Sequence, residues 1–233
     1  MREGGGVDPR RNAGCDPRGP LAYSRAMPAQ PVPLSGDEAL MLAYAAGDAA
    51  AFDALYARHK GGSYRYLLRH CGNAGTADEM FQDVWMNVIR ARATYAPTAK
   101  FTTWLYRIAH NRLVDHWRAS GHVELVAAHA DDDDDAVDPL SRVAAARASM
   151  PDVRTQAKQI GTRIDAALRT LPAAQRDAFL LQHEGGLSLA EIAELTGVGA
   201  ETVKSRLRYA TARLRAELAD LADFGDDALD EST

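Results

Sequence analysis

The sequence predicts an all-α protein with two small helical domains joined by a flexible acidic linker. Apolar residues recur at helical spacing through most of residues 36–118 and 160–218. No segment alternates apolar and polar residues in the way that a half-buried strand does. The stretch between the two helical parts contains the run Asp131–Asp135 and is rich in Ala and Pro, which is typical of a linker.

Two helical segments open the predicted N-terminal domain. Ser35 and Glu38 have the spacing of a capping box, in which a Ser or Thr and a Glu three residues later satisfy the first N–H groups of a helix. The helical pattern then extends to Tyr56. Residues 64–70 form a further predicted helix, which Gly72 ends.

Two longer helices complete this domain. Thr76 and Glu79 form a second capping box and open a predicted helix to about Ala93. Pro97 then breaks the chain before a helix over residues 101–118. The apolar stripes expected to face the core are Phe81, Val84, Trp85 and Val88 in the first helix, and Phe101, Leu105, Ile108 and Ala109 in the second.

The C-terminal domain is also predicted to be helical. Helical order resumes near Ile160, and Pro172 suits the first turn of a helix that runs to Glu184. Gly185 and Gly186 end that helix.

A helix–turn–helix pattern follows and is the strongest local signal. Ser188 and Glu191 form a third capping box for a helix to Thr196, with hydrophobic staple positions at Leu187 and Ile192. A tight turn over residues 197–199 leads to a second helix that begins at Ala200. A helix, a short glycine-containing turn and a second helix are the arrangement of many DNA-binding domains.

The second helix of this pair has two distinct faces. One face is apolar and should pack on the domain: Val203, Leu207, Ala210 and Leu214. The other face is polar and flanked by Thr202 and Arg206: Glu201, Lys204, Ser205, Arg208 and Arg215. Lys204 is the best candidate for a base contact, because Lys or Arg can read guanine in the major groove. The alternative is an amphipathic surface helix whose charges are solvated.

Charge is segregated along the chain, which has a net charge of −5. Acidic residues gather in Asp131–Asp135 and in residues 220–231, and basic residues gather in residues 100–118 and 204–215. Two separate basic helices on an acidic chain indicate two contacts with DNA. The acidic tail could compete with DNA for Lys204, Arg206 and Arg208 in the second helix of the helix–turn–helix, although a role in solubility is the simpler interpretation.

Several motifs together resemble a known family. Leu171–Arg176, Leu189–Ala193 and Thr202–Leu207 resemble region 4 of sigma factors, although LuxR-type response regulators share part of this pattern. One departure is Gly199, where both families often have a Ser cap. Asp78–Trp85 resembles sigma region 2.2, and Phe101–Asn111 resembles regions 2.3 and 2.4, which response regulators lack. The chain thus resembles the extracytoplasmic-function (ECF) sigma factors of the sigma-70 family.

This resemblance implies a function for each domain. Residues 34–119 would be region 2, and residues 160–219 would be region 4, which reads the −35 element. Residues 1–33 would be a disordered extension, with Met1 or Met27 as the true start, residues 120–159 the linker and residues 220–233 an acidic tail. The implied partners are core RNA polymerase, through its β′ clamp helices and β flap, promoter DNA and an anti-sigma factor.

Site residues follow from the same resemblance and from the helix faces. Region 2 would bind core polymerase through Asp78, Glu79, Gln82 and Asp83. It would capture and melt the −10 element through Tyr95, Lys100, Trp104, Arg107, Asn111 and Arg118. Region 4 would bind the −35 element through Glu201, Thr202, Lys204, Ser205, Arg206 and Arg208. Cations, an amide and aromatic faces are the groups that single-stranded DNA requires. Tyr95 and Trp104 could also be core aromatics, and Asp78 and Glu79 could act only as helix caps.

Other classes of function have little support in the sequence. There is no Cys-x-x-Cys pair, no zinc-binding His spacing and no glycine-rich phosphate loop, so no enzyme, cofactor or metal site is expected. Cys15 and Cys71 lie far apart, which argues against a disulfide framework. No stretch is long and apolar enough for a membrane span, and the expected location is the cytoplasm.

Overall fold

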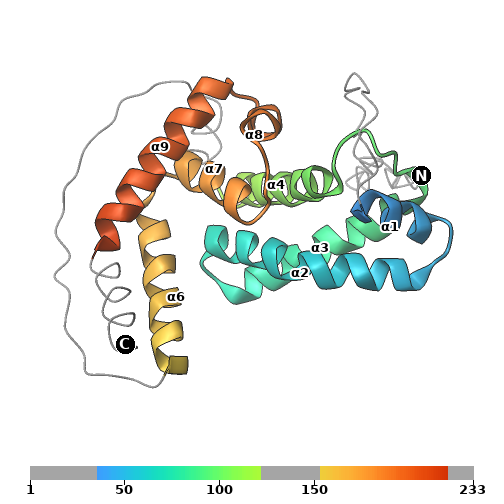
Figure 1. The fold of residues 1–233 in the computed structure, drawn as a ribbon, viewed down its shortest axis with the longest axis horizontal. Helices are drawn as coiled ribbons and strands as arrows, with labels where there is room; N and C mark the ends of the chain where they lie inside the picture. Colours follow the sequence, from blue (N-terminus) through green and yellow to red (C-terminus); the bar gives the residue numbers. More distant parts are fainter. Residues whose placement is uncertain (1–35, 122–152, 220–233) are drawn as a thin grey trace, which may run out of the picture.

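The structure, a computed structural model, describes residues 36–121 and 153–219 (Figure 1). These two ranges contain eight α-helices, one 3-10 helix and no strand, so the all-α prediction is confirmed. The predicted N-terminal extension, the Asp131–Asp135 run and the acidic tail lie outside the described residues.

The N-terminal domain consists of the elements α1 (Gly36–Ala45), α2 (Ala49–Cys71), α3 (Ala74–Ala91), η1 (Arg92–Thr94) and α4 (Phe101–Ala119). The C-terminal domain consists of α6 (Val153–Thr170), α7 (Ala173–His183), α8 (Leu189–Thr196) and α9 (Ala200–Glu217). Helix α6 begins earlier than the sequence predicted, within the expected linker.

Helix α2 is one continuous helix of 23 residues, so the predicted break between Tyr56 and residue 64 is wrong. Asp48 begins it by accepting a hydrogen bond from the N–H of Ala50 (2.9 Å), and Gly72 ends it with a φ of 66°. Gly62, inside the predicted break, lies where another part of the chain comes very close. A Cβ added there would lie 3.0 Å from the backbone oxygen of Glu184 in the C-terminal domain. This glycine therefore allows a close approach between domains and does not end the helix.

The N-cap of helix α3 lies three residues before the predicted Thr76 cap. Asn73 is its N-cap, and the Asn73 side chain accepts a hydrogen bond from the N–H of Thr76 (3.3 Å). Asn is as good a cap as Thr, and an earlier cap adds a turn of helix before the buried stripe. The non-helical segment at Pro97 and the start of α4 at Phe101 follow the prediction.

The helix–turn–helix follows the prediction throughout. Ser188 and Glu191 form the capping box of α8, with the staple residues Leu187 and Ile192 buried. Gly197 ends α8 with a φ of 75°, a left-handed conformation that glycine adopts without strain. Gly199 is the N-cap of α9 and makes no side-chain cap bond. The buried residues of α9 are the predicted Val203, Leu207, Ala210 and Leu214.

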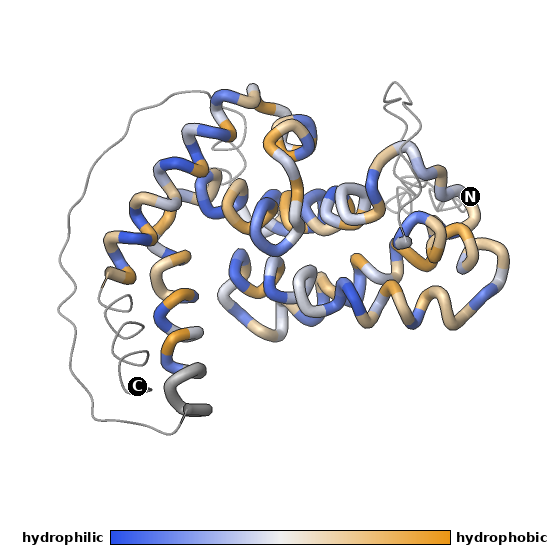
Figure 2. Tube along the Cα trace, in the orientation of Figure 1, coloured by the Kyte–Doolittle hydropathy of each residue, from blue (hydrophilic) through white to orange (hydrophobic). Residues whose placement is uncertain are grey.

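The two domains share one hydrophobic core. Buried apolar side chains form a single cluster that runs from Met41 in α1 to Leu214 in α9. Helix α7 of the C-terminal domain packs against α9 of its own domain and against α2 of the N-terminal domain, and therefore lies at the contact between the domains (Figure 1). Hydrophilic and hydrophobic residues alternate along α6 and α9, as expected of helices with one buried face (Figure 2). The sequence motifs of the two domains gave no indication of this packing.

Candidate nucleic-acid interface

The N-terminus of α4 is fixed by a carboxylate from α1. Glu38 is buried, and its side chain accepts a hydrogen bond from the N–H of Phe101, the first residue of α4. The α4 N-cap residue, Lys100, makes no side-chain cap bond of its own. A carboxylate at this position satisfies a free N–H group and interacts favourably with the positive end of the helix dipole. The segment 95–100 before α4 is thus anchored at its end, although the sequence suggested for Glu38 only a role in capping its own helix.

Two aromatic side chains form a small cluster at this end of α4. Tyr95 and Trp104 are both half-buried, with ring centroids 5.0 Å apart and nearly perpendicular planes. Trp104 also packs on Phe101, at 5.8 Å between centroids. Burial, together with the charge of Glu38, raises the pKa of the Tyr95 hydroxyl, so it stays protonated. The pair therefore contributes to the core and also offers ring surface at the helix end.

The polar residues predicted to bind the −10 element, which we call the polar stripe of α4, fall into two groups: Lys100 with Arg107, and Asn111 with Arg118. Asn111 and Arg118 are exposed to solvent in the C-terminal half of the helix. At the other end, Arg107 lies 2.9 Å from Glu194 and Lys100 lies 3.3 Å from Glu191, measured between side-chain nitrogen and oxygen. Both acidic partners belong to α8, so two of the four stripe residues pair with the C-terminal domain.

Glu191 is the centre of this contact. Its carboxylate caps α8 by accepting a hydrogen bond from the Ser188 N–H (2.8 Å), and it also accepts one from Thr103 Oγ1 in α4 (2.7 Å). Burial by itself would raise the pKa of Glu191. The hydrogen bonds from Ser188 and Thr103 and the charge of Lys100 outweigh burial and lower this pKa to about 2. The carboxylate is therefore ionised at neutral pH in this arrangement.

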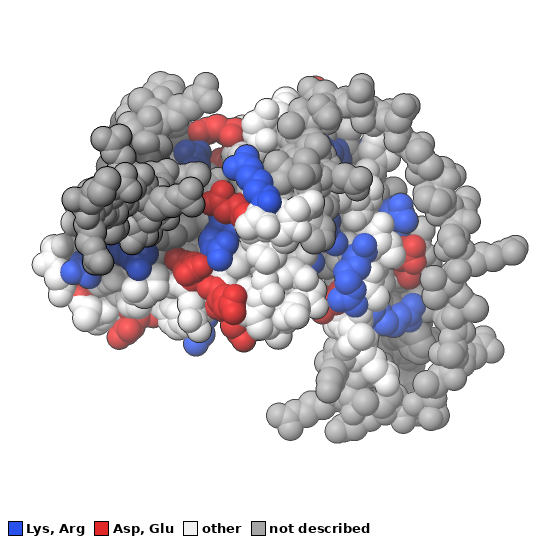
Figure 3. Space-filling model, turned by 180° about the vertical axis from the view of Figure 1, so that it is seen from behind, with Lys and Arg blue, Asp and Glu red and all other residues white. Residues whose placement is uncertain are grey.

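A second set of ion pairs lies around the end of α7. The Glu184 side chain is 8% exposed and is paired with two arginines of α2, Arg65 (2.7 Å) and Arg69. Arg69 also lies 3.0 Å from Asp165 of α6. The backbone oxygen of Glu184 accepts a hydrogen bond from Tyr106 Oη of α4 (2.6 Å). Acidic and basic side chains lie next to each other over the middle of the molecule (Figure 3).

A buried polar cluster joins the domains beneath these pairs. Asp177 of α7 is fully buried, and its carboxylate accepts a hydrogen bond from Tyr66 Oη of α2 (2.8 Å). The same carboxylate lies 3.2 Å from a ring nitrogen of His70 and 3.2 Å from a ring nitrogen of His110. Burial lowers the pKa of His70, although Asp177 opposes that change. An ionisable residue of one domain is thus held inside the other by polar partners, which offset its desolvation.

The four predicted polymerase-binding residues share an exposed face of α3. Asp78, Glu79, Gln82 and Asp83 are all exposed. Asp83 forms an ion pair with Arg112 of α4 at 2.8 Å, so it has a partner within its own domain. Met86 lies one turn beyond Gln82 and is 44% exposed. Met86 was not among the predicted site residues, although its spacing from Gln82 and Asp83 is that of a shared helix face.

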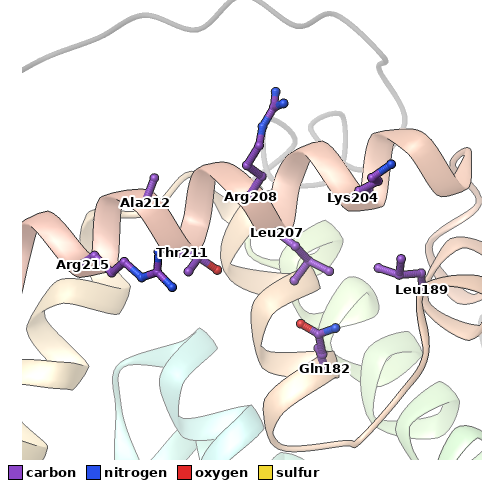
Figure 4. A pocket seen from close by; sticks show the side chains of 8 residues that line it. All are labelled: Gln182, Leu189, Lys204, Leu207, Arg208, Thr211, Ala212 and Arg215. Carbon is purple, nitrogen blue, oxygen red and sulfur yellow. The ribbon is translucent and has the colours of Figure 1, made fainter.

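The polar face of α9 is open to solvent. Glu201, Lys204 and Arg208 are exposed, while Thr202, Ser205 and Arg206 are half-buried. Lys204 lies 3.4 Å from Glu201 on the same helix. Leu207 points toward Gln182 of α7, and Arg208 points away from the domain (Figure 4). A shallow groove runs along this face, lined by Gln182, Leu189, Lys204, Leu207, Arg208, Thr211, Ala212 and Arg215.

The described residues contain neither a cluster of metal-binding side chains nor a membrane-spanning helix. No group of three or more His, Cys, Asp or Glu residues within them could hold a metal ion. No helix in the described ranges is long and apolar enough to span a membrane.

Comparison with known proteins decides between the two families that the C-terminal motifs left open. The N-terminal domain matches sigma-70 region 2 over residues 55–123, and the C-terminal domain matches sigma-70 region 4 over residues 162–214. The chain is 30% identical over 188 residues to the ECF RNA polymerase sigma factor SigM of Mycobacterium tuberculosis, covering 81% of this chain and 85% of SigM. The chain belongs to the ECF sigma factors of the sigma-70 family. It directs promoter-specific transcription initiation.

Further relatives of this ECF sigma factor agree. RNA polymerase sigma factor CarQ of Myxococcus xanthus is 31% identical over 171 residues, which cover 73% of this chain and 91% of CarQ. Among solved structures, CnrH in complex with the cytosolic domain of CnrY has a TM-score of 0.55 at 24% identity and covers 80% of this chain and 99% of that chain. RpoE in complex with the anti-sigma factor NepR from Bartonella quintana has a TM-score of 0.51 at 21% identity, covering 72% and 96%. At these identities the two structures show a shared fold.

Proposed function

We propose that this sigma factor divides promoter recognition between its two domains. The N-terminal domain would capture and melt the −10 element, and α9 would read the −35 element. The observation that carries this division is the polar surface of α4. Exposed Asn111 and Arg118 continue the stripe of Arg107 and Lys100, which leads to the aromatic pair at the helix start.

The −10 element would bind as a single strand along α4. Lys100, Arg107 and Arg118 supply positive charge for phosphates, and the Asn111 amide can hydrogen-bond a base edge. A base flipped out of the duplex would enter the region formed by residues 95–100 and Trp104. Extruding a base costs a few kcal/mol, which stacking and hydrogen bonding in a pocket offset, so melting follows from binding energy. The Glu38 anchor at the start of α4 supports this role, because it fixes the loop end nearest to the captured base.

The −35 element would lie across α9. Recognition helices place their early side chains on base edges and later cations near phosphates. Lys204 is exposed in the second turn and can reach a guanine, with Glu201, Thr202 and Ser205 beside it. Arg206 and Arg208 would contact the backbone.

Core polymerase would bind the exposed face of α3. Its acidic and amide groups (Asp78, Glu79, Gln82 and Asp83) would meet the β′ clamp helices, and the C-terminal domain would meet the β flap. Exposed Met86 adds an apolar contact to the same face. An anti-sigma factor is a further proposed partner, since CnrH and RpoE are found in complexes with CnrY and with the anti-sigma factor NepR.

Transcription in vitro tests the proposal. Bacterial core polymerase would be incubated with fragmented genomic DNA, with and without the protein. We expect new transcripts at discrete start sites, whose upstream sequences reveal the −10 and −35 elements together. No stimulation, combined with duplex binding in the absence of core polymerase, would contradict the proposal and favour a stand-alone helix–turn–helix regulator.

A further inference from the structure

The groove along α9 carries positive charges that have no carboxylate partner on another element. Arg215, Leu207 and Lys204 follow one another along the helix, and Arg208 points away from the domain (Figure 4). Lys204 pairs with Glu201 of the same helix at 3.4 Å, and among the residues that the structure describes no carboxylate pairs with Arg208 or Arg215. By contrast, six cations of the N-terminal domain each have a carboxylate partner on another element: Arg58, Arg65, Arg69, Lys100, Arg107 and Arg112.

The same groove also offers apolar surface. Leu189, at the start of α8, is 37% exposed and lines the groove opposite α9. Ala212 is exposed on α9, and Leu207 is nearly buried at 8%. A segment that fits the groove therefore needs carboxylates for the cations and apolar side chains between them.

The acidic tail, residues 220–233, has this composition. It lies outside the described residues and follows directly after α9 along the chain. It contains six acidic residues and no basic residue, with Leu221, Phe224 and Leu229 placed among them. The run Asp131–Asp135 is also strongly acidic, but it has no apolar residue within it. The acidic tail is therefore the better match to the groove.

The spacing of the tail's acidic residues fits the spacing of the cations. Arg208 and Arg215 lie about 10 Å apart along the axis of α9, at a rise of about 1.5 Å per residue. Asp223 and Asp226 are three positions apart, and three residues of extended chain also cover about 10 Å. The groove is about 17 Å long. Residues 219–230 can span about 35 Å, so the chain can reverse direction and run back along α9.

We propose that the groove along α9 is a binding site for the acidic tail of the same chain. Asp223 pairs with Arg215 and Asp226 pairs with Arg208, while Phe224 covers the apolar surface between them. Carboxylates at this spacing occupy cations that would otherwise contact phosphates, so the tail and the −35 duplex compete for α9. This inference rests on the −35 role proposed for α9.

Duplex binding by the free protein tests the competition. The probe is a fluorescein-labelled duplex that carries the −35 sequence found by transcription. The tail variant carries Asp220→Asn, Asp223→Asn, Asp226→Asn, Asp227→Asn and Asp230→Asn. The matched linker variant carries Asp131→Asn, Asp132→Asn, Asp133→Asn, Asp134→Asn and Asp135→Asn. Both variants lose five negative charges, so general repulsion of DNA changes equally. We expect the affinity of the tail variant to exceed that of the linker variant about fivefold or more.

Arg215→Gln tests the groove side of the contact. Arg215 is not among the residues proposed to contact the −35 element, so its removal releases the tail and raises the duplex affinity, although the protein loses a positive charge. We expect a rise of about twofold or more. Arg213→Gln is the matched control, because it removes the same charge from the same helix outside the groove lining. We expect no rise for this control.

Pulsed electron paramagnetic resonance locates the tail directly. One spin label is placed at Ala228→Cys in the tail and the other at Ala200→Cys, an exposed position at the start of α9. The full chain is used, with Cys15 and Cys71 replaced by Ala. We expect a short and narrow distance distribution, which becomes longer and broader when the five tail substitutions are added.

Three results would overturn the tail site. The first is an equal gain of duplex affinity in the tail and linker variants, and the second is a fall in affinity for Arg215→Gln. The third is a short distance from the tail label to a label at Gln159→Cys of α6, in place of the short distance to α9.

A footprint of the holoenzyme on the promoter separates these failures from failure of the proposed function. A holoenzyme that protects the −35 element, while the tail variant shows no gain in the free protein, counts against the tail site alone. A wild-type holoenzyme that leaves the −35 element unprotected counts against the −35 role of α9.

Discussion

Asp177 of the C-terminal domain places its carboxylate 2.8 Å from the hydroxyl of Tyr66 in the N-terminal domain, where both side chains are fully buried. This hydrogen bond joins the two domains through residues that lie 111 positions apart in the sequence. A buried carboxylate is favourable only while its partners remain in place. Separation of the domains would expose this carboxylate to water. Apolar side chains in place of the whole cluster would stabilise the closed arrangement about as well.

Asp177→Ala should destabilise the described fold. The change leaves Tyr66 without its acceptor and removes the carboxylate beside two buried histidines, so we expect a loss of about 3 kcal/mol in the free energy of unfolding. Urea denaturation followed by circular dichroism measures it. Asp53→Asn removes an exposed charge from α2 and serves as the control. A loss no larger than that of the control would mean that the cluster contributes nothing to stability.

Acidification should favour domain opening. Burial lowers the pKa of His70 below its usual 6.5, an effect opposed by Asp177 and supported by Arg176 and His110. His70 therefore binds a proton less readily in the closed form than in an opened form, where it meets water. The stabilisation of the closed form is thus present above about pH 6.5 and is lost as the pH falls below it.

Pulsed electron paramagnetic resonance from about pH 7.5 to about pH 5.5 checks this pH dependence. Spin labels at Asp53→Cys of α2 and Ala212→Cys of α9, both exposed positions, report the distance between the domains. We expect a longer-distance population to grow at low pH in the wild type and to grow less in His70→Gln. A population that does not change with pH would remove His70 from the control of opening.

Glu38→Gln should weaken promoter opening without weakening polymerase binding. The substitution keeps the size of the side chain but replaces a charged acceptor at the start of α4 with a neutral one, for which we expect about fivefold less open complex. Heparin-resistant complex formation by the holoenzyme measures the opening. Asp37→Asn is the matched control, since Asp37 pairs with Arg58 and His59 of α2 and not with α4. Equal losses in core binding and in opening would indicate that Glu38 acts only on the fold.

Asn111→Ala should reduce melting of the −10 element. The amide is exposed on α4, so its removal leaves packing intact and takes away one hydrogen bond to a base edge. We expect about tenfold less permanganate reactivity of −10 thymines, with normal co-purification on core polymerase. A bubble of wild-type intensity would exclude Asn111 from the contact.

Asp83→Lys should reduce association with core polymerase. The charge reversal acts on the exposed face of α3, and we expect association to fall about fivefold or more. It also breaks the ion pair with Arg112, so Arg112→Gln, which removes that pair and leaves Asp83 unchanged, is the control. Pull-down with core enzyme compares the two. If both variants bind equally well, Asp83 does not lie in the interface.

The sequence by itself determined the local structure of most elements. The capping box of Ser188 and Glu191, the glycine turn and the apolar face of α9 were all read from short-range spacing, because such features depend on neighbours within one or two turns. The family also followed from local motifs. The predicted break within α2 was wrong because Gly62 allows a close contact with the backbone of Glu184. That residue is distant in the chain, so local spacing could not indicate the contact.

Only the tertiary structure decided how charged residues are paired. Glu38 looked like a cap of its own helix, yet it binds the start of α4, and Glu191 caps α8 while also meeting Lys100 and Thr103. Asp177, inside a polar helix segment, gave no signal at all. Packing of the two domains brings such groups within a few ångströms of each other, in surroundings of low polarity that strengthen their pairing. The spacing of residues along the chain does not specify these contacts.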